Sequence, residues 1–245
     1  LSGMRPTGRL HLGNYVGALE NWVRLQDSGW TNFHMVADWH MLTTGYEDTS
    51  RLQQHTWDMV LDWLGAGIDP VKSVIFVQSA VKEHAELHLL LSMVTPLGKL
   101  TDLPTFKDKV RQHPNNVNYG LVGYPVLMTA DIALYRARYV PVGIDQAPHL
   151  EFAREIVRSF NHRYGRDVLV EPEMKITEVP KVLGIDGQQK MGKSLNNHIE
   201  LAATPEETIK RVMSMVTDPP RIKRTDPGRP EICNVCQLHR FFGGD

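Results

Sequence analysis

A glycine-rich turn that leads into a helix is the first segment whose residue types could do chemistry. Residues 3–14 read Gly-Met-Arg-Pro-Thr-Gly-Arg-Leu-His-Leu-Gly-Asn. Glycines let a ligand approach the backbone closely, and a helix N-terminus offers free N–H groups and positive potential to an anion. His11 and Asn14 lie where each could donate to phosphate oxygens. The pattern predicts a nucleotide site that is not a Walker A loop, although a turn without a ligand would explain the glycines alone.

A lysine pair in a polar loop is the second such segment. Residues 190–194 read Lys190-Met191-Gly192-Lys193-Ser194, within the polar stretch 181–197. Two lysines three residues apart, with a glycine between them, form a flexible clamp that can follow the charge building on pyrophosphate. Taken alone, a solvated surface loop is the commoner explanation of such a segment.

The elements that must position these residues alternate between strand-like and helix-like segments, which predicts an α/β fold with a mostly parallel sheet. A polar loop is expected at 181–197, and a linker or arm at 218–230. The apolar period fades at 101–118, so a surface loop or a partly ordered helix is expected there. Buried strands are expected at 33–37, 74–77 and 139–142, and helices at 14–25, 52–64, 84–94, 126–136, 146–161 and from Thr204 onward.

Composition limits the class of protein. The chain has 245 residues, 42% hydrophobic and 22% charged, with a formal net charge of -1, which is ordinary for a soluble globular protein. A nucleic-acid partner would therefore need a local basic patch. No apolar run is long enough to span a membrane, and the first residues do not resemble a signal peptide. The two cysteines, Cys233 and Cys236, exclude a disulfide framework and indicate a reducing compartment, so a cytoplasmic location is expected.

Three segments together resemble a known family. His11-Leu12-Gly13-Asn14 is similar to the first signature of class I aminoacyl-tRNA synthetases, which usually ends in a second His; Asn is typical of the tryptophan enzymes. The segment 190–194 resembles the second signature, where Gly192 replaces a usual Ser. The segment 124–132 resembles the specificity helix of bacterial-type tryptophanyl-tRNA synthetases. The resemblance covers essentially the whole chain and implies a Rossmann-like parallel sheet with helices on both faces, followed by the start of an α-helical C-terminal domain.

The resemblance implies that ATP, with Mg²⁺ on its phosphates, activates L-tryptophan, which then passes to tRNA(Trp). Asp131 would accept a hydrogen bond from the indole N–H, which is reasonable because indole has one donor and no acceptor. A structural ion pair of Asp131 with Arg136 or Arg138 is the alternative. The other expected tryptophan contacts are Met128, His40, Val140, Val142 and Gln146, of which Met128 could equally be core and His40 structural.

The resemblance also assigns the nucleotide contacts. Asp145 would hold the ribose, although it could instead cap the helix that follows it. Lys190, Lys193 and Lys109 are the expected catalytic residues, and Lys109 rests on a segment whose length differs from the family pattern. Lys107 and Lys109 could also be a solvated charge run. The remaining expected ATP contacts are Arg5, Pro6, Thr7, His11, Gly13, Asn14, Gly143, Ile144, Val182, Met191, Gly192 and Ser194.

Domain and partner expectations follow from the same resemblance. A catalytic domain is expected at 1–190, with a dimerisation insert around 84–125, and a lysine loop with a partial helical domain at 190–245. The protein is expected to be a homodimer, with residues missing before Leu1 and a larger piece after Asp245. The basic residues of 210–229 could bind tRNA or form a solvated arm. Cys233 and Cys236 have metal-ligand spacing, but free thiols are expected rather than an iron–sulfur cluster, and no metal site of the protein's own is expected.

Three other functions remain open at this point. A tyrosyl-tRNA synthetase shares the fold and both signatures, but a phenol both donates and accepts, and no Tyr partner for Asp131 is evident. A small nucleotidyl transferase would share the first signature without the specificity helix. A binding paralogue without turnover would keep the pocket, and the departure at Gly192 leaves room for that.

Overall fold

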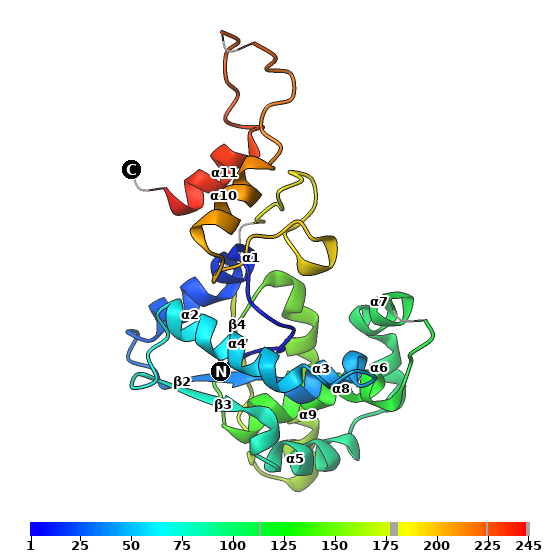
Figure 1. The fold of residues 1–245 in the computed structure, drawn as a ribbon. Coiled ribbons are helices and arrows are strands. Elements are labelled where there is room, and N and C mark those ends of the chain that lie inside the picture. The colour runs from blue at the N-terminus through cyan, green and yellow to red at the C-terminus, as the bar shows by residue number, and fades with distance from the viewer. Residues whose placement is uncertain (113, 177–180, 224, 244–245) are drawn as a thin grey trace. The chain divides into compact units, whose positions relative to one another are not determined.

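The computed structural model describes residues 1–112, 114–176, 181–223 and 225–243 (Figure 1). Within them, no helix is both long and apolar enough to cross a membrane. The strands are β1 (Ser2–Met4), β2 (Asn32–Val36), β3 (Ser73–Val77), β4 (Tyr139–Val142) and β5 (Glu173–Ile176). The α-helices are α1 (Leu12–Asn14), α2 (Glu20–Leu25), α3 (Asp38–Gly45), α4 (Leu52–Gly65), α5 (Glu83–Ser92), α6 (Leu97–Asp102), α7 (Pro104–Gln112), α8 (Tyr119–Leu134), α9 (Ala147–Tyr164), α10 (Pro205–Met213) and α11 (Asn234–Phe242). A π-helical segment covers Tyr15–Leu19, and single 3-10 turns cover Gln78–Ala80, Ile144–Gln146 and Lys193–Leu195.

The chain forms two compact units that are discontinuous in sequence. Unit 1 contains Leu1–Thr7, Thr31–Trp57 and Pro70–Glu178, and unit 2 contains Gly8–Trp30, Asp58–Asp69 and Val179–Asp245. The domains expected from the sequence are consecutive, with a boundary near 190, so the compact units divide the chain differently. The functional domain boundaries stay a prediction.

Unit 1 contains the sheet, and its pairing is parallel throughout. Strands β1, β2 and β3 form one sheet in that order, with Ser2 opposite His34 and Phe33 opposite Val74. Strands β4 and β5 form a second parallel pair. The α/β class and the parallel pairing are therefore confirmed. The sequence did not indicate β5, because Glu173–Ile176 is mostly exposed and alternates charged with apolar residues.

Helix α8 is central to unit 1, where it packs against α5 and α9 (Figure 1). The shared core includes Leu91, Val126, Phe152 and Ile156. The helix begins seven residues before the expected 126, because the side chain of Asn118 caps it by accepting from the N–H of Leu121 at 2.9 Å. It ends at Leu134 rather than at 136, since Arg136 takes a left-handed backbone conformation with φ 52°.

The charged stretch 101–118 is helical over α7. Its charge is explained by exposed ion pairs, in which Lys107 binds Asp102 at 3.3 Å and Arg111 binds Asp108 at 2.5 Å. Of the two structures expected for this stretch, the helix is the one found.

Unit 2 begins with a continuous helical run from Leu12 to Leu25, formed by α1, the π-helical segment and α2. Trp22 of this run packs edge-on against Trp63, with ring centroids 5.3 Å apart. Helices α10 and α11 lie side by side (Figure 1) and share a core with Val16, Val182 and Met191. Thr204 and Glu207 form a capping box at α10, which confirms the helix start expected there.

Candidate functional site

A buried carboxylate lies at the centre of the polar cluster in unit 1. Asp131 on α8 is 2% exposed, and three side chains donate to it. His40 Nε2 on α3 lies 2.7 Å from Oδ2, His84 Nδ1 on α5 lies 2.7 Å from Oδ1, and Gln78 Nε2 lies 2.8 Å from Oδ1. The expected alternative partners are wrong: Arg138 binds Glu173, and Arg136 donates to the carbonyl of Val168.

These donors keep Asp131 ionised. Burial alone would raise its pKa, but the hydrogen bonds from His40 and His84, together with the charge these side chains can carry, outweigh burial and lower the pKa. An ionised carboxylate has about four lone-pair positions. Gln78 and His84 take both positions on Oδ1, and His40 takes one on Oδ2. One acceptor position on Oδ2 is therefore left for a further donor.

An apolar cluster adjoins Asp131 along α8 and β4. Met128 and Val142 are partly buried, and both pack with the buried Val140 around Ile132 and Leu150. The structure thus brings together three of the predicted tryptophan contacts, Met128, Val140 and Val142, and separately joins His40 to Asp131. The sixth, Gln146, lies exposed at the start of α9.

The turn between β4 and α9 carries the residues predicted to hold the ribose. Gly143 accepts from the N–H of Gln146 at 2.9 Å, and Ile144 is 69% exposed. The side chain of Asp145 lies outside what the structure describes, so neither of its two expected roles is tested.

Two cationic side chains of unit 1 lie near one another. The half-buried ammonium of Lys109 on α7 has a lowered pKa, first because of burial and then because of the positive charge of Arg5. Two neighbouring positive charges repel one another, and an anion bound between them would offset that repulsion. Pro6 and Thr7 follow Arg5 directly. These three residues are the predicted ATP contacts in the first segment of unit 1.

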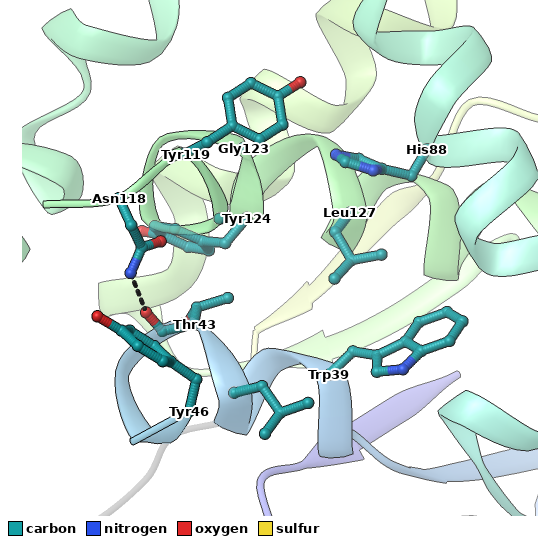
Figure 2. Close-up of a pocket in the computed structure, with 11 residues that line it drawn as sticks. Trp39, Thr43, Tyr46, His88, Asn118, Tyr119, Gly123, Tyr124 and Leu127 are labelled. Atoms are coloured by element: carbon teal, nitrogen blue, oxygen red, sulfur yellow. Dashed lines mark hydrogen bonds between the residues drawn. The ribbon is translucent and has the colours of Figure 1, made fainter.

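A cavity of about 450 Å³ opens beside the carboxylate cluster, and sequence reasoning did not predict it (Figure 2). Trp39 and Thr43 from α3, His88 from α5, and Tyr124 and Leu127 from α8 line it. None of the predicted site residues is among its lining residues. The cavity uses the same three helices as the carboxylate cluster. Its lining residues Thr43, His88 and Leu127 each lie one helical turn from a member of that cluster, and so on the same face of their helix.

Unit 2 holds the other part of the predicted ATP set, beginning with the first signature. Asn14 caps the turn, because its Oδ1 accepts from the N–H of His11 at 3.0 Å. A Cβ at Gly13 would lie 3.0 Å from His11 Nδ1 and 3.4 Å from the Cβ of Met191, so a larger residue would displace the imidazole. Asp62 also fixes the turn, because its Oδ2 accepts from the N–H of Leu10 at 2.6 Å.

His11 is a buried, neutral imidazole with an unused nitrogen. Burial lowers its pKa to about 4, and His198, Lys193 and Lys190 add to the shift. Its Nδ1 has no hydrogen-bond partner among the described residues. A buried nitrogen in that state costs free energy unless a ligand pairs with it, which fits the role predicted for His11.

The lysine loop is tied to the first signature within unit 2. Lys193 Nζ donates to the carbonyls of Gly8 at 3.3 Å and Arg9 at 3.1 Å. The backbone of Leu12 donates to Ile199, and that of Leu201 to Leu10. Lys190 and Ser194 are exposed, so their side chains are available to a ligand. The two predicted signatures therefore lie together, as their joint chemistry requires.

Asn197 holds the lysine loop, and sequence reasoning missed it. It is 2% exposed, accepts from the N–H of Gly192 at 2.8 Å, and donates to Asp186 Oδ2 at 2.7 Å. The only signal in the sequence is that Asn197 is a polar residue at the end of the predicted loop 181–197. Val182 and Met191, by contrast, are buried in the core of unit 2, so only their backbone could face a nucleotide.

The two cysteines lie at the start of α11 in unit 2. Cys233 and Cys236 are free, and Cys233 caps α11 by accepting from the N–H of Cys236 at 3.3 Å. Within the described residues, no group of three or more His, Cys, Asp or Glu side chains is placed to hold a metal ion. Two thiolates alone are too few for an iron–sulfur cluster.

Comparison with known proteins identifies the family. The model of the class I tRNA synthetases for tryptophan and tyrosine matches residues 1–245. A tryptophan–tRNA ligase of Thermotoga maritima is 51% identical over 99% of this chain and 74% of its own length. One of Aquifex aeolicus is 40% identical over 100% of this chain and 79% of its own length. A crystal structure of a Campylobacter jejuni tryptophanyl-tRNA synthetase with ADP and tryptophan has a TM-score of 0.90, at 38% identity over 100% of this chain and 75% of that one.

The chain belongs to the class I tRNA synthetases of the tryptophan and tyrosine group. The Rossmann-like α/β fold expected from the resemblance is confirmed.

Proposed function

We propose that this protein activates L-tryptophan with ATP and transfers it to tRNA(Trp). The observation that carries the proposal is the remaining acceptor position on Asp131 Oδ2, beside the apolar cluster of Met128, Val140 and Val142. Indole offers one N–H donor on an apolar ring system, which this combination matches. Relatives at 40–51% identity that are named tryptophan–tRNA ligases support the same choice of amino acid.

The proposed reaction needs no covalent nucleophile from the protein. The tryptophan carboxylate oxygen attacks the α-phosphorus of ATP, the bond to the β-phosphate oxygen breaks, and pyrophosphate leaves with that electron pair. The protein orients the two anions and offsets their repulsion. Mg²⁺ would be held by phosphate oxygens rather than by a protein cage. The adenylate then transfers its aminoacyl group to the terminal ribose of tRNA, and AMP leaves.

Cationic side chains and a buried imidazole would act on the phosphates in this step. Lys190 and Lys193 carry the cations of the lysine loop, and His11 supplies an unpaired buried nitrogen. In unit 1, Arg5 and Lys109 supply two neighbouring cations. Asp145 would bind ribose hydroxyls. Gly13, Asn14, Gly143, Ile144 and Gly192 would bind ATP through their backbone or polar side chains.

ATP–pyrophosphate exchange with each amino acid in turn tests the proposal. We expect exchange with tryptophan, and aminoacylation of a tRNA bearing the tryptophan anticodon. Exchange with tyrosine and not with tryptophan would overturn the choice of amino acid. A tyrosine pocket would need a free donor for the phenol oxygen, but His40, His84 and Gln78 all direct their donors at Asp131.

A second copy of this chain is the proposed partner of an apolar face on α5 in unit 1. Leu89, Leu90 and Met93 are 57%, 50% and 71% exposed. Exposed apolar residues gathered on one helix are typical of an interface. We expect a dimer in sedimentation velocity and a monomer for the Met93→Asp variant. A monomeric wild type at micromolar concentration would contradict the dimer.

The basic residues in the last turn of α10 and in the stretch that follows it would contact the tRNA. Arg211 and Arg229 bind Asn196 and Asp218 within the chain, whereas Lys210 and Lys223 are exposed. Lys223→Ala should therefore weaken tRNA binding and lower its salt dependence by about one counterion, without changing adenylate formation. A cytoplasmic location is expected from the same function, because charged tRNA is used there.

A further inference from the structure

A chain of hydrogen bonds runs from a tyrosine hydroxyl to the buried carboxylate. Tyr135, at the C-terminal end of α8, has its hydroxyl 2.9 Å from Nε2 of His84. His84, in the first turn of α5, is 0% exposed, and its Nδ1 lies 2.7 Å from Oδ1 of Asp131. All three side chains belong to unit 1.

The direction of each bond follows from the chemistry of its atoms. An ionised carboxylate can only accept, so the proton of this pair lies on His84 Nδ1. When the ring carries that single proton, Nε2 accepts and the Tyr135 O–H donates to it. Burial, with the charges of Asp131 and Glu83, raises the pKa of Tyr135 to about 12, so the hydroxyl keeps its proton at neutral pH.

Packing fixes the tyrosine ring at this position. Its centroid lies 5.1 Å from that of Phe76, 5.3 Å from that of Phe33 and 5.4 Å from that of His84. A ring packed in this way holds its hydroxyl beside Nε2 of His84.

We propose that Tyr135, acting through His84, is a positioning residue for recognition of the indole N–H. With Oδ1 held by His84 and Gln78, the carboxylate plane cannot rotate, and the remaining acceptor position on Oδ2 keeps one direction. Tyr135 itself would touch no substrate. The inference rests on the proposed function, because it explains how the Asp131 of that function is oriented.

Removal of the Tyr135 hydroxyl breaks this chain of hydrogen bonds at the end farther from Asp131. In Tyr135→Phe, His84 Nε2 loses its hydrogen-bond partner, so the imidazole is no longer held at both of its nitrogens. The ring can then shift, its hydrogen bond to Asp131 Oδ1 weakens, and the carboxylate is free to turn. The value of kcat/KM should therefore fall for substrates that donate an indole N–H, and should stay the same for analogues that lack it.

The test compares tryptophan with its analogue in which sulfur replaces the indole N–H. The readout is the ratio of the two kcat/KM values in ATP–pyrophosphate exchange. We expect Tyr135→Phe to lower this ratio about three- to tenfold, the range of one neutral hydrogen bond, with the KM for ATP unchanged. The control is Tyr164→Phe: Tyr164 is 57% exposed and packs on Phe160, so its loss should leave the ratio as in the wild type.

Repeating the Tyr135→Phe substitution in a His84→Asn variant distinguishes a positioning role of Tyr135 from a merely structural one. In His84→Asn, the amide can still donate toward Asp131 but no longer reaches Tyr135. Tyr135→Phe should then have no further effect on the ratio, because the link that carries its effect is gone. Equal losses for tryptophan and the sulfur analogue, or the same Tyr135→Phe effect in both backgrounds, would overturn the inference. A wild type without tryptophan exchange would instead overturn the proposed function.

Discussion

Replacement of Asp131 by Asn tests the central carboxylate of unit 1. The carboxylate accepts from three side chains, but an amide has one acceptor oxygen and an NH₂ group. If the oxygen faces Gln78 and His84, the NH₂ points along the direction of Oδ2, toward the donor of the substrate. A charge-assisted hydrogen bond contributes about 1.5–3 kcal/mol, so kcat/KM for tryptophan should fall about 10- to 150-fold. The KM for ATP should change less than about twofold, because that substrate makes no use of this bond.

The assay for Asp131→Asn is ATP–pyrophosphate exchange at varied tryptophan and varied ATP. The sulfur analogue without an N–H should lose far less than tryptophan, so discrimination between the two substrates should nearly disappear. Asp167→Asn, an exposed carboxylate in the loop after α9, is the matched control and should behave as the wild type. Equal losses in tryptophan and ATP kinetics, or a collapse in thermal stability that accounts for the lost activity, would refute the reasoning and make Asp131 structural.

Three further predictions concern the lysine loop and pH. Gly192→Ser should fold normally and keep or raise activity, since its backbone is extended at φ −167° and a Cβ there would meet only the carbonyl of Lys190 at 3.9 Å; an activity loss beyond tenfold would contradict this. Asn197→Ala removes three hydrogen bonds of the loop, at 2.8, 2.7 and 3.4 Å, and should lower kcat by about tenfold while leaving tryptophan binding by equilibrium titration unchanged. Burial lowers the pKa of His11 and of His34 to about 4, so between pH 6.5 and 4 the unfolded chain binds protons that the folded chain does not. The free energy of unfolding in urea should therefore fall from pH 7 to pH 5 by about 2 kcal/mol for each histidine, and His11→Asn should show a smaller fall than the wild type.

Local patterns in the sequence were sufficient for the regular elements. Alternating apolar segments predicted β2, β3 and β4 and their parallel pairing, because a buried strand between amphipathic helices leaves few other arrangements. The start of α10 followed from Thr204, Pro205 and Glu207, whose roles at a helix N-terminus depend only on neighbouring residues. The same locality explains the failures: Asn118 caps α8 from outside the apolar pattern, and the exposed β5 has no apolar pattern that would mark a buried strand.

The partners of the site residues could not be predicted, because they come from distant parts of the chain. The sequence offered Arg136 and Arg138 as neighbours of Asp131, yet its donors lie 91, 53 and 47 residues away. Proximity in sequence favours residues on the same helix, whereas α3 and α5 bring His40 and His84 to α8 through tertiary packing. Met128, Val140 and Val142 were assigned from the family resemblance and remain predicted contacts; they pack in one apolar cluster, because a pocket for an apolar ring uses the residue types that also form core.

The two signatures of unit 2 owe their geometry to residues outside both motifs. Asp62 holds the first turn through Leu10, although burial raises the pKa of its carboxyl and so weakens its preference for the ionised form. Asn197 holds the second loop through Gly192. The Lys193 side chain connects the lysine loop to the first signature by donating to the carbonyls of Gly8 and Arg9. Phosphate oxygens that bind this ammonium must therefore replace two neutral acceptors. Anionic acceptors form the stronger hydrogen bonds, and the gain increases as negative charge builds on the leaving pyrophosphate. In the proposed reaction, the same lysine would therefore tie the loop to the first signature before nucleotide arrives and would bind most strongly as the phosphate bond breaks.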